Sequence, residues 1–198
     1  RGDRVLLVLD SITRFAHALR EVATGTGEPP VARGYPASVF TELPKLLERA
    51  GPGVEGSGSI TAIISVLIDG DDHNDPVADS VRGILDGHVV LDRRLAARGH
   101  YPAIDVLTSL SRVMPSVTDE PHRLAARRAR ALLAVYEEKR ELIALGAYGK
   151  GSDARVDQAI LAAPELERFL RQEPSQIEAF TGSLAGLRAI ADRHPEQR

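Results

Sequence analysis

The feature that most constrains the fold is a run of five consecutive valine and leucine residues near the start of the chain, residues 5–9, which ends at Asp10 and Ser11. A continuous apolar run of this length is typical of a central parallel strand that is buried on both faces. Apolar residues then recur at helical spacing, where Ser11 or Thr13 can cap a helix and Gly25 and Gly27 stop it. The opening of the chain therefore predicts a strand followed by a helix, as in an α/β fold.

A second strand is expected over residues 59–68, and it also ends in a polar loop, the acidic stretch 69–76. Polar residues at the carboxyl ends of two strands are what the ligand-binding edge of an α/β sheet requires. Strand and helix alternate up to about residue 115. The remaining expected elements are a loop over 25–36, a helix over 37–50 that Pro44 bends or delays, a helix over 77–86, a strand over 88–91, a helical turn over 93–98 and extended chain over 101–111.

The sequence becomes helical in character after Pro115. A long helix rich in Ala, Leu, Arg and Glu is expected over 119–147, and Ser152 is expected to cap a helix over 153–163. Two further helical pieces follow over 165–172 and 175–193. We therefore expect two domains, an α/β domain over residues 1–117 and an α-helical domain over 118–198.

The composition excludes several classes of protein. Because the chain has no cysteine, it has no disulfide framework, no thiolate metal site and no cysteine nucleophile. Its 25 Lys+Arg against 28 Asp+Glu do not favour a general nucleic-acid surface. The longest apolar stretches reach about half of the roughly 20 residues that a membrane span needs, so we expect a cytoplasmic protein. The apolar run begins almost at once after Arg1, without a methionine, which indicates a fragment whose upstream partner strands are missing.

Two groups of residues near the expected sheet edge are candidates for chemistry. Asp10 can hold a magnesium ion through water beside the phosphates of a nucleotide, and Arg14 can reach the same phosphates; equally, Asp10 is a helix cap and Arg14 a solvated side chain. The loop with Asp69, Asp71, Asp72, His73 and Asp75 has three interpretations. It is a solvated turn, a contact for a basic partner or a divalent metal site.

Further candidates lie in the second half of the chain. Arg112 follows an extended segment and can act as an arginine finger across a subunit boundary. Tyr101 and Phe180 stand out in a chain with few aromatics, where they either sandwich a planar base or belong to the core or a hinge. The basic patch at 127, 128 and 130 is balanced by nearby glutamates, so an ordinary solvated helix face is expected there. The sequence contains no Gly-x-Ser-x-Gly, no His-Glu-x-x-His and no Gly-x-x-x-x-Gly-Lys-Ser/Thr, so a self-contained catalytic constellation is missing.

Six stretches, taken in order, resemble one family. They are LDSITRFA (9–16), GYPAS (34–38), DGDDHNDP (69–76), ILDGH (84–88), GHYPAID (99–105) and SLSR (109–112). Together they are similar to the flagellum-specific export ATPases of type III secretion, relatives of the catalytic subunit of rotary ATP synthases. The resemblance implies a partial RecA-like parallel sheet core followed by an α-helical C-terminal domain, and it implies that the Walker A loop and the catalytic glutamate lie upstream of this chain.

The resemblance also implies roles for single residues. Asp10 takes the Walker B role near magnesium, Arg14 contacts phosphate, and Arg112 is the finger offered to the ATP of a neighbouring subunit. Tyr101 stacks on adenine and Phe180 is a second aromatic there. The acidic loop, with Asp71, Asp72 and Asp75, matches the loop that touches a central stalk, which suits a basic coiled-coil stalk protein.

At the level of the whole protein, the resemblance implies a homohexameric ring that couples ATP hydrolysis to chaperone release and substrate unfolding. The ring would be cytoplasmic and peripheral to the inner membrane, at the export gate. Ser11 in place of the asparagine of the synthases and the stretch 146–152 resemble the export branch, and the missing DELSEED stretch argues against a proton-translocating rotor partner. Residues 69–75 and 99–105 favour the flagellar over the injectisome type.

Two other classes of function stay open at this stage. The chain is alternatively a non-catalytic module that binds export chaperones or the stalk protein, or a metal-dependent hydrolase that uses the acidic loop and His73. The fragment alone is expected to be inactive, because the phosphate cradle is not in it.

Overall fold

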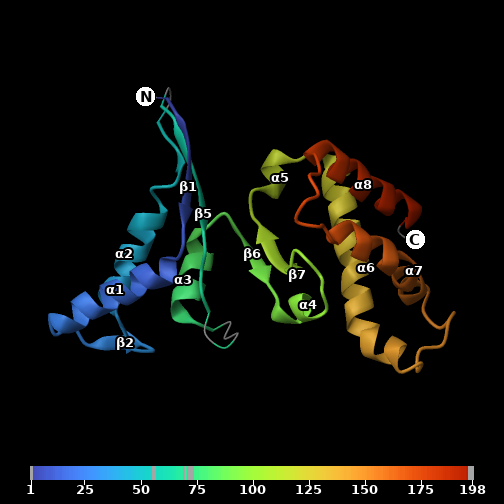
Figure 1. Ribbon diagram of the computed structural model, residues 1–198, viewed down its shortest axis with the longest axis horizontal. Coiled ribbons are helices and arrows are strands. Elements are labelled where there is room, and N and C mark those ends of the chain that lie inside the picture. Colours follow the sequence, from blue (N-terminus) through green and yellow to red (C-terminus); the bar gives the residue numbers. More distant parts are fainter. Residues whose placement is uncertain (1, 55–56, 69, 71–73, 196–198) are drawn as a thin grey trace. The chain divides into compact units, whose positions relative to one another are not determined.

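The computed structural model describes residues 2–54, 57–68, 70 and 74–195 (Figure 1). The chain divides into two compact units, Arg1–Leu85 and Asp86–Arg198. The compact second unit includes the extended segments over 87–91 and 104–111 together with the helices that follow them. The sequence pattern instead assigned these segments to the α/β domain over 1–117. The domain boundary expected between residues 117 and 118 stays a prediction.

The first unit is built on a short parallel sheet. Strand β1 (Arg4–Leu9) pairs in parallel with β5 (Ser59–Ile64), in register from Arg4 opposite Ser59 to Leu9 opposite Ile64. The short strand β4 (Gly51–Pro52) lies antiparallel on the other side of β5. The predicted strand over 59–68 is therefore shorter than expected, because residues 65–68 leave the sheet.

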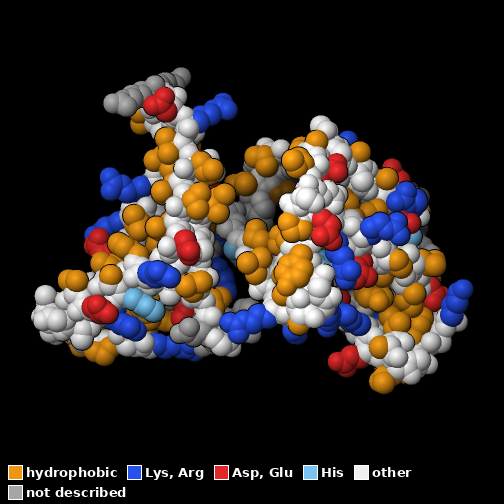
Figure 2. Space-filling model, viewed as in Figure 1, with side chains coloured by type: hydrophobic (Ala, Val, Ile, Leu, Met, Phe, Trp, Pro, Cys, Tyr) orange, Lys and Arg blue, Asp and Glu red, His pale blue; other side chains and the backbone are white. Residues whose placement is uncertain are grey.

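The expected burial of β1 on both faces is wrong for the described structure. The side chains of residues 5–8 are between 45% and 66% exposed, and Figure 2 shows hydrophobic side chains at the surface along the ribbon of β1 and β5. Within the described residues β1 has one neighbouring strand, β5, and the apolar cluster of the unit reaches only its last residue, Leu9. The apolar sequence of β1 suits a strand that is covered on both faces. The described residues cover only part of it.

Three helices form the core of the first unit at the carboxyl ends of the strands: α1 (Ile12–Gly25), α2 (Ala37–Leu47) and α3 (Pro76–Ile84). Apolar residues four positions apart lie on one face of a helix. Val39, Leu43 and Leu47 of α2 follow this spacing and are no more than 3% exposed. Pro44 lies inside α2, which continues past it.

The expected loop over 25–36 instead contains a β-hairpin, β2 (Pro30–Ala32) and β3 (Tyr35–Pro36). Its two turn residues, Arg33 and Gly34, have φ values of 43° and 84°. A two-residue hairpin turn of this kind needs positive φ at both positions. Glu28, just before the hairpin, accepts a hydrogen bond of 2.9 Å from the backbone N–H of Ser38 in the first turn of α2. Hydrogen bonding from Ser38 lowers the pKa of Glu28, so this contact is made by a carboxylate.

The second unit begins with an antiparallel pair, β6 (Gly87–Leu91) and β7 (Ile104–Ser111), with the short helix α4 (Arg93–Ala97) between them. The helices α5 (Met114–Val117), α6 (Glu120–Ala144), α7 (Ala154–Leu170) and α8 (Phe180–Arg193) follow. Buried residues of α6, α7 and α8 form one apolar cluster: Ala129, Leu132, Ala159, Ala162, Leu166 and Ile190. None of the described helices is long and apolar enough to cross a membrane.

Three expectations about the last helices are wrong in detail. The pieces predicted over 153–163 and 165–172 are one helix, α7, because Pro164 lies inside it without ending it. Its N-cap is Asp153, whose side chain accepts from the N–H of Arg155 at 2.8 Å, whereas the hydroxyl of Ser152 bonds to the carbonyl of Gly149. The last helix begins at Phe180, five residues later than expected, and residues 171–179 are not helical.

Candidate functional site

The carboxyl ends of β1 and β5 hold Asp10 and Ser65 together. Because Leu9 is opposite Ile64, the next residue of each strand lies at the same edge of the sheet. The Ser65 hydroxyl donates a 2.6 Å hydrogen bond to Oδ1 of Asp10. The Ser65 N–H donates to the carbonyl of Leu9, and its carbonyl accepts from the N–H of Ile12, both at 3.0 Å. The exposed carboxylate of Asp10 is thus oriented by the neighbouring strand.

Two hydroxyl residues follow Asp10. Ser11 occupies the N-cap position of α1, after a cis peptide bond, but its side chain makes no capping hydrogen bond. The Ser11 side chain is buried, and its Oγ has no hydrogen-bond partner among the described residues. Thr13 Oγ1 donates to the carbonyl of Leu67 at 3.2 Å and accepts from the N–H of Leu67 at 2.9 Å. Thr13 therefore fastens α1 to the chain beyond β5, and the Ser11 hydroxyl is the polar atom at this edge that lacks a partner.

Arg14 lies in the first turn of α1, and its side chain is exposed. Its position four residues after Asp10 places it near the same end of the sheet. Its phosphate contact stays a prediction.

The acidic loop is described only in part. Asp69, Asp71, Asp72 and His73 lie outside the described residues. Asp75 is the N-cap of α3, and its Oδ1 accepts a 2.8 Å hydrogen bond from the N–H of Ala78. Over the described ranges, no group of three or more His, Asp or Glu is arranged to hold a metal ion. The partner role predicted for Asp71, Asp72 and Asp75 stays a prediction.

Arg112 directly follows β7 in the second unit. Its backbone N–H donates a 2.7 Å hydrogen bond to the carbonyl of Asp86, and its side chain is exposed. Gly87 lies opposite Ser111, where a Cβ at position 87 would stand 2.5 Å from the carbonyl oxygen of Leu110. Because real Cβ atoms essentially never come so close to backbone, glycine at 87 sets the spacing between the strands next to Arg112. The sequence motif ILDGH contains this glycine for a steric reason.

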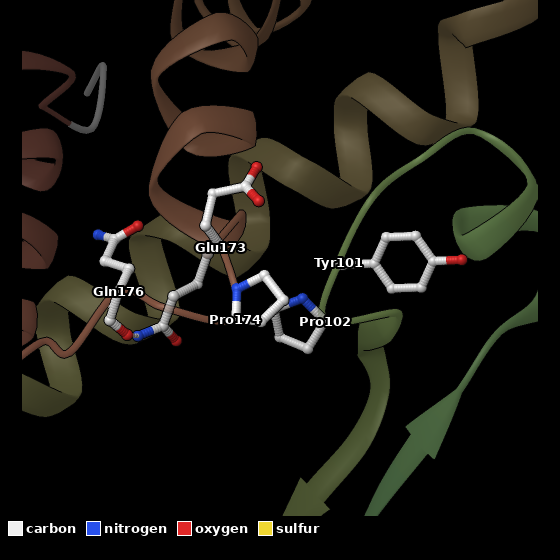
Figure 3. Close-up of a pocket in the computed structure, with 6 residues that line it drawn as sticks. Tyr101, Pro102, Glu173, Pro174 and Gln176 are labelled. Atoms are coloured by element: carbon white, nitrogen blue, oxygen red, sulfur yellow. Dashed lines mark hydrogen bonds between the residues drawn. The ribbon is translucent and has the colours of Figure 1, made fainter.

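Tyr101 lies in the loop between α4 and β7, beside a hollow of about 300 Å³. The hollow is lined by Tyr101, Pro102, Gln172, Glu173, Pro174 and Gln176. The carbonyl of Tyr101 accepts a 2.9 Å hydrogen bond from the N–H of Gln172, which fixes the loop against the chain after α7. Figure 3 shows the ring of Tyr101 directed away from Pro174 and Gln176. Tyr101 is 55% exposed.

His100 supports the Tyr101 loop from inside. It is buried, and its N–H donates to the carbonyl of Leu95 at 3.0 Å. Burial, followed by the positive charge of Arg171, lowers the pKa of His100, while Glu167 opposes the shift. The imidazole is therefore neutral near pH 7 and packs as a core side chain beneath the loop.

Phe180 is not one of the residues that line this hollow. It is 72% exposed at the first position of α8, and its ring centroid lies 6.1 Å from that of His122. The structure does not bring Phe180 and Tyr101 together as a sandwich, and the base contacts expected of both residues stay predictions.

The solvated helix face expected for the basic patch is wrong for Arg128, which is partly buried, whereas Arg127 and Arg130 are exposed as expected. The guanidinium of Arg128 donates to the carbonyls of His194 and Pro195 and to the side chain of Gln158. That of Arg130 donates to three carbonyls of β7. The sequence shows that the charges on this helix are balanced. It does not show which carbonyl groups of distant segments need a donor, so the hydrogen bonds of Arg128 and Arg130 were missed.

Ser65 was also missed. It was expected inside a longer strand, and only the register of β1 with β5 places the residue after Ile64 beside Asp10.

The donor set at the β1–β5 edge fits a hydrated magnesium ion with phosphate. Mg²⁺ prefers oxygen ligands, keeps several waters and is held by one or two carboxylates. Asp10 supplies an oriented carboxylate, and the buried hydroxyl of Ser11, without a partner in the described structure, can accept from or donate to a bound group. These features define the class as an α/β fold with an oxygen-donor site at the carboxyl ends of two parallel strands, followed by an α-helical region.

Comparisons with known proteins agree with this class. Residues 1–111 match the model of the ATP synthase alpha/beta family, nucleotide-binding domain. Residues 118–189 match the T3SS EscN ATPase C-terminal domain. The chain belongs to the ATP synthase alpha/beta family. The predicted fold class and the resemblance to flagellar and type III secretion ATPases are confirmed.

Individual relatives come from both secretion branches. The chain is 57% identical over 195 residues to the flagellum-specific ATP synthase of Rhizobium meliloti (strain 1021), covering 96% of this chain and 42% of that protein. It is similar to the assembled ATPase EscN of the enteropathogenic E. coli type III secretion system, with a TM-score of 0.90 and 46% identity over 94% of this chain and 45% of that one. A structure of EscN in complex with its central stalk EscO gives a TM-score of 0.83 and 44% identity, over 94% of this chain and 44% of that one. The chain thus spans less than half the length of these relatives.

Proposed function

We propose that this chain is part of a type III export ATPase of the flagellar type and carries the magnesium carboxylate and the arginine finger of its ATP hydrolysis. The observation that carries the proposal is the Asp10–Ser65 hydrogen bond of 2.6 Å at the carboxyl ends of two parallel strands, next to the buried Ser11 hydroxyl. The match of residues 1–111 to the nucleotide-binding domain supports it.

In this mechanism each residue has one task. Asp10 would hold a magnesium ion, and Ser65 keeps its carboxylate in place. When bound, Mg²⁺ supplies positive charge that neutralises the phosphate oxygens. Arg14 binds phosphate from the first turn of α1, and Tyr101 offers its exposed ring to the adenine. Arg112 reaches the nucleotide of a neighbouring subunit, where it stabilises the charge that develops on the transferred phosphoryl group.

A mixed-ring experiment on the full-length protein tests this division of roles. Arg112→Ala should lower kcat by about 10³-fold and leave nucleotide binding nearly unchanged, because a finger acts on the transition state. Asp10→Asn should also abolish turnover. If the finger acts in trans, mixing the two inactive variants should restore part of the activity, at interfaces where an intact Asp10 meets an intact Arg112.

The outcomes of this experiment are distinct. Full turnover by Arg112→Ala rejects the finger role. If the two inactive variants form mixed rings and still recover no activity, Asp10 and Arg112 act in the site of the same subunit. The 198-residue chain alone is expected not to hydrolyse ATP, and turnover by the short chain would move the catalytic site elsewhere.

We further propose a ring, a stalk partner and export chaperones for the whole protein. The assembled form and stalk complex of EscN support the first two. Reversing Asp71 and Asp72 to lysine in the full-length protein should weaken binding of a basic coiled-coil stalk and spare basal hydrolysis. Equal affinity of the stalk for wild type and variant would reject the loop assignment. We place the protein in the cytoplasm, peripheral to the inner membrane at the export gate.

A further inference from the structure

Strand β7 contains a bulge at residues 106–109, shortly before Arg112. From His88 opposite Leu110 to Val90 opposite Asp105, β6 advances two residues while β7 advances five. Residues 106–109 of β7 thus lie opposite the single residue Val89 of β6, which gives β7 three extra residues. A bulge of this kind leaves backbone groups without partners in the ladder, and it changes the direction of the strand.

Side chains from outside the strand lie beside all four carbonyl groups of the bulge. The guanidinium of Arg130 donates from Nη1 to the carbonyls of Val106 and Ser109 and from Nη2 to that of Leu107. Nε2 of His88 lies 3.2 Å from the carbonyl of Thr108. Arg130 alone thus binds three of the four.

The bulge also has internal bonds that give it a defined shape. Oδ1 of Asp105 accepts from the N–H groups of Leu107 and Thr108, at 2.9 and 3.2 Å. The Ser109 hydroxyl donates to the carbonyl of Asp105 at 2.6 Å and accepts from the N–H of Val90 at 2.9 Å. These bonds shape the bulge within the strand pair, and Arg130 is the contact that ties it to a helix.

That helix is α6, whose buried residues pack with α7 and α8 in the apolar cluster of the unit. Arg130 is one residue from Ala129, which is 6% exposed in that cluster. A guanidinium has a rigid planar fork, so it transmits the position of its helix to three carbonyls at once; an ammonium on a flexible stem does not. Ser109, one of the three bound residues, is three residues, or roughly 10 Å of strand, from Arg112.

We propose that Arg130 is a positioning residue for the arginine finger: it couples the place of α6 to the reach of Arg112. The inference rests on the proposed function of Arg112, and it adds that α6, through Arg130, controls the position of Arg112. A shift of α6 then moves the end of β7, so α6 adjusts turnover although Arg130 itself does not contact the nucleotide.

The test uses steady-state ATP hydrolysis by the full-length protein, with Arg130→Ala, Arg130→Lys and the control Arg127→Ala. Arg127 is exposed and three residues earlier on the same helix, so its variant loses the same charge without touching β7. We expect Arg130→Ala to lower kcat by about 10-fold or more with KM for ATP changed less than about 2-fold, as for a group that acts only in the transition state. Arg130→Lys should lose about 5-fold, and Arg127→Ala should match the wild type.

A double-variant cycle separates positioning from general structural damage. In the Arg112→Ala background, Arg130→Ala should produce no further loss of kcat, because the finger that it positions is already absent. Losses that multiply, or an equal loss in Arg127→Ala, overturn the inference. If Arg130→Ala has a normal kcat and Arg112→Ala is slow, the inference about Arg130 is wrong but the proposed function stands. If Arg112→Ala has a normal kcat, the proposed function itself is wrong.

Thermal unfolding and ring assembly are measured on every variant. If Arg130→Ala does not assemble, the Arg130→Lys pair of single and double variants decides the question. A Lys variant with wild-type kcat overturns the inference, and one that is slow only when Arg112 is present supports it.

Discussion

Removing the side chain of Leu166 tests whether α6, α7 and α8 form one packed core. Leu166 is 1% exposed in the middle of α7. Replacement by alanine removes three carbon atoms, and at about 0.8 kcal/mol for each buried carbon the lost transfer free energy is about 2.4 kcal/mol. The cavity left behind raises the loss of unfolding free energy to about 3 kcal/mol. Leucine and alanine are both strong helix formers, so helix propensity contributes little to the change.

The measurement is urea unfolding of the 198-residue chain, followed by circular dichroism at the helix band. The control is Leu161→Ala, the same substitution on the same helix at a side chain that is 67% exposed. The control should change the unfolding free energy by less than about 0.5 kcal/mol. In a thermal scan, Leu166→Ala should unfold roughly 12 °C lower, at about 4 °C for each kcal/mol in a unit of this size. A loss below about 1 kcal/mol for Leu166→Ala, or equal losses for the two variants, would refute the packing argument.

Three further predictions concern the strand ends and the helix cap. Gly87→Ala in the full-length protein should lower kcat by about 10-fold at similar KM, because a Cβ there meets backbone at 2.5 Å, whereas Gly83→Ala, with nothing within 4 Å, should not; equal turnover would contradict the steric argument. Ser65→Ala should weaken magnesium–nucleotide binding about 5-fold in a titration, by removing the 2.6 Å bond to Asp10, and an unchanged Kd would reject that role. The pKa of Asp119 is lowered, first by the backbone N–H that it caps and then by an arginine of α8, so its contribution to stability is present above the unfolded-state pKa of about 3.9 and lost as the pH falls through the folded-state value. Urea midpoints measured from about pH 6 to 2 should therefore fall more steeply for wild type than for Asp119→Asn, and parallel curves would contradict the assignment.

The sequence was sufficient for those features that depend on local pattern. The apolar run before Asp10 predicted a parallel strand, and the segment after residue 36 predicted a helix, because both patterns follow from the geometry of the element itself. The main strands and helices of the first 111 residues, apart from the short strands β2, β3 and β4, and the helical character of the rest follow in the same way.

The features that sequence did not predict depend on contacts between distant residues. Arg130 looks like any arginine on a charged helix, and only the bulge in β7 gives its guanidinium three carbonyls to bind. A proline such as Pro164 usually indicates the end of a helix. Here the packing of Leu166 and its neighbours keeps α7 continuous on both sides of Pro164. Asp10 was identified as a candidate by its position after a strand, whereas its partner Ser65 required the register of that strand with β5.

The contact between Glu28 and Ser38 makes the β2–β3 hairpin a suitable place for a reporter. The N-cap position of α2 is Pro36, which has no side-chain capping bond, and Glu28 supplies an acceptor from ten residues earlier. The hairpin between them is closed by this bond at its base, so the start of the helix does not depend on the sequence of the turn. A fluorophore or a short epitope tag inserted between Arg33 and Gly34 should therefore leave the helical core intact and provide a handle for following the protein in cells.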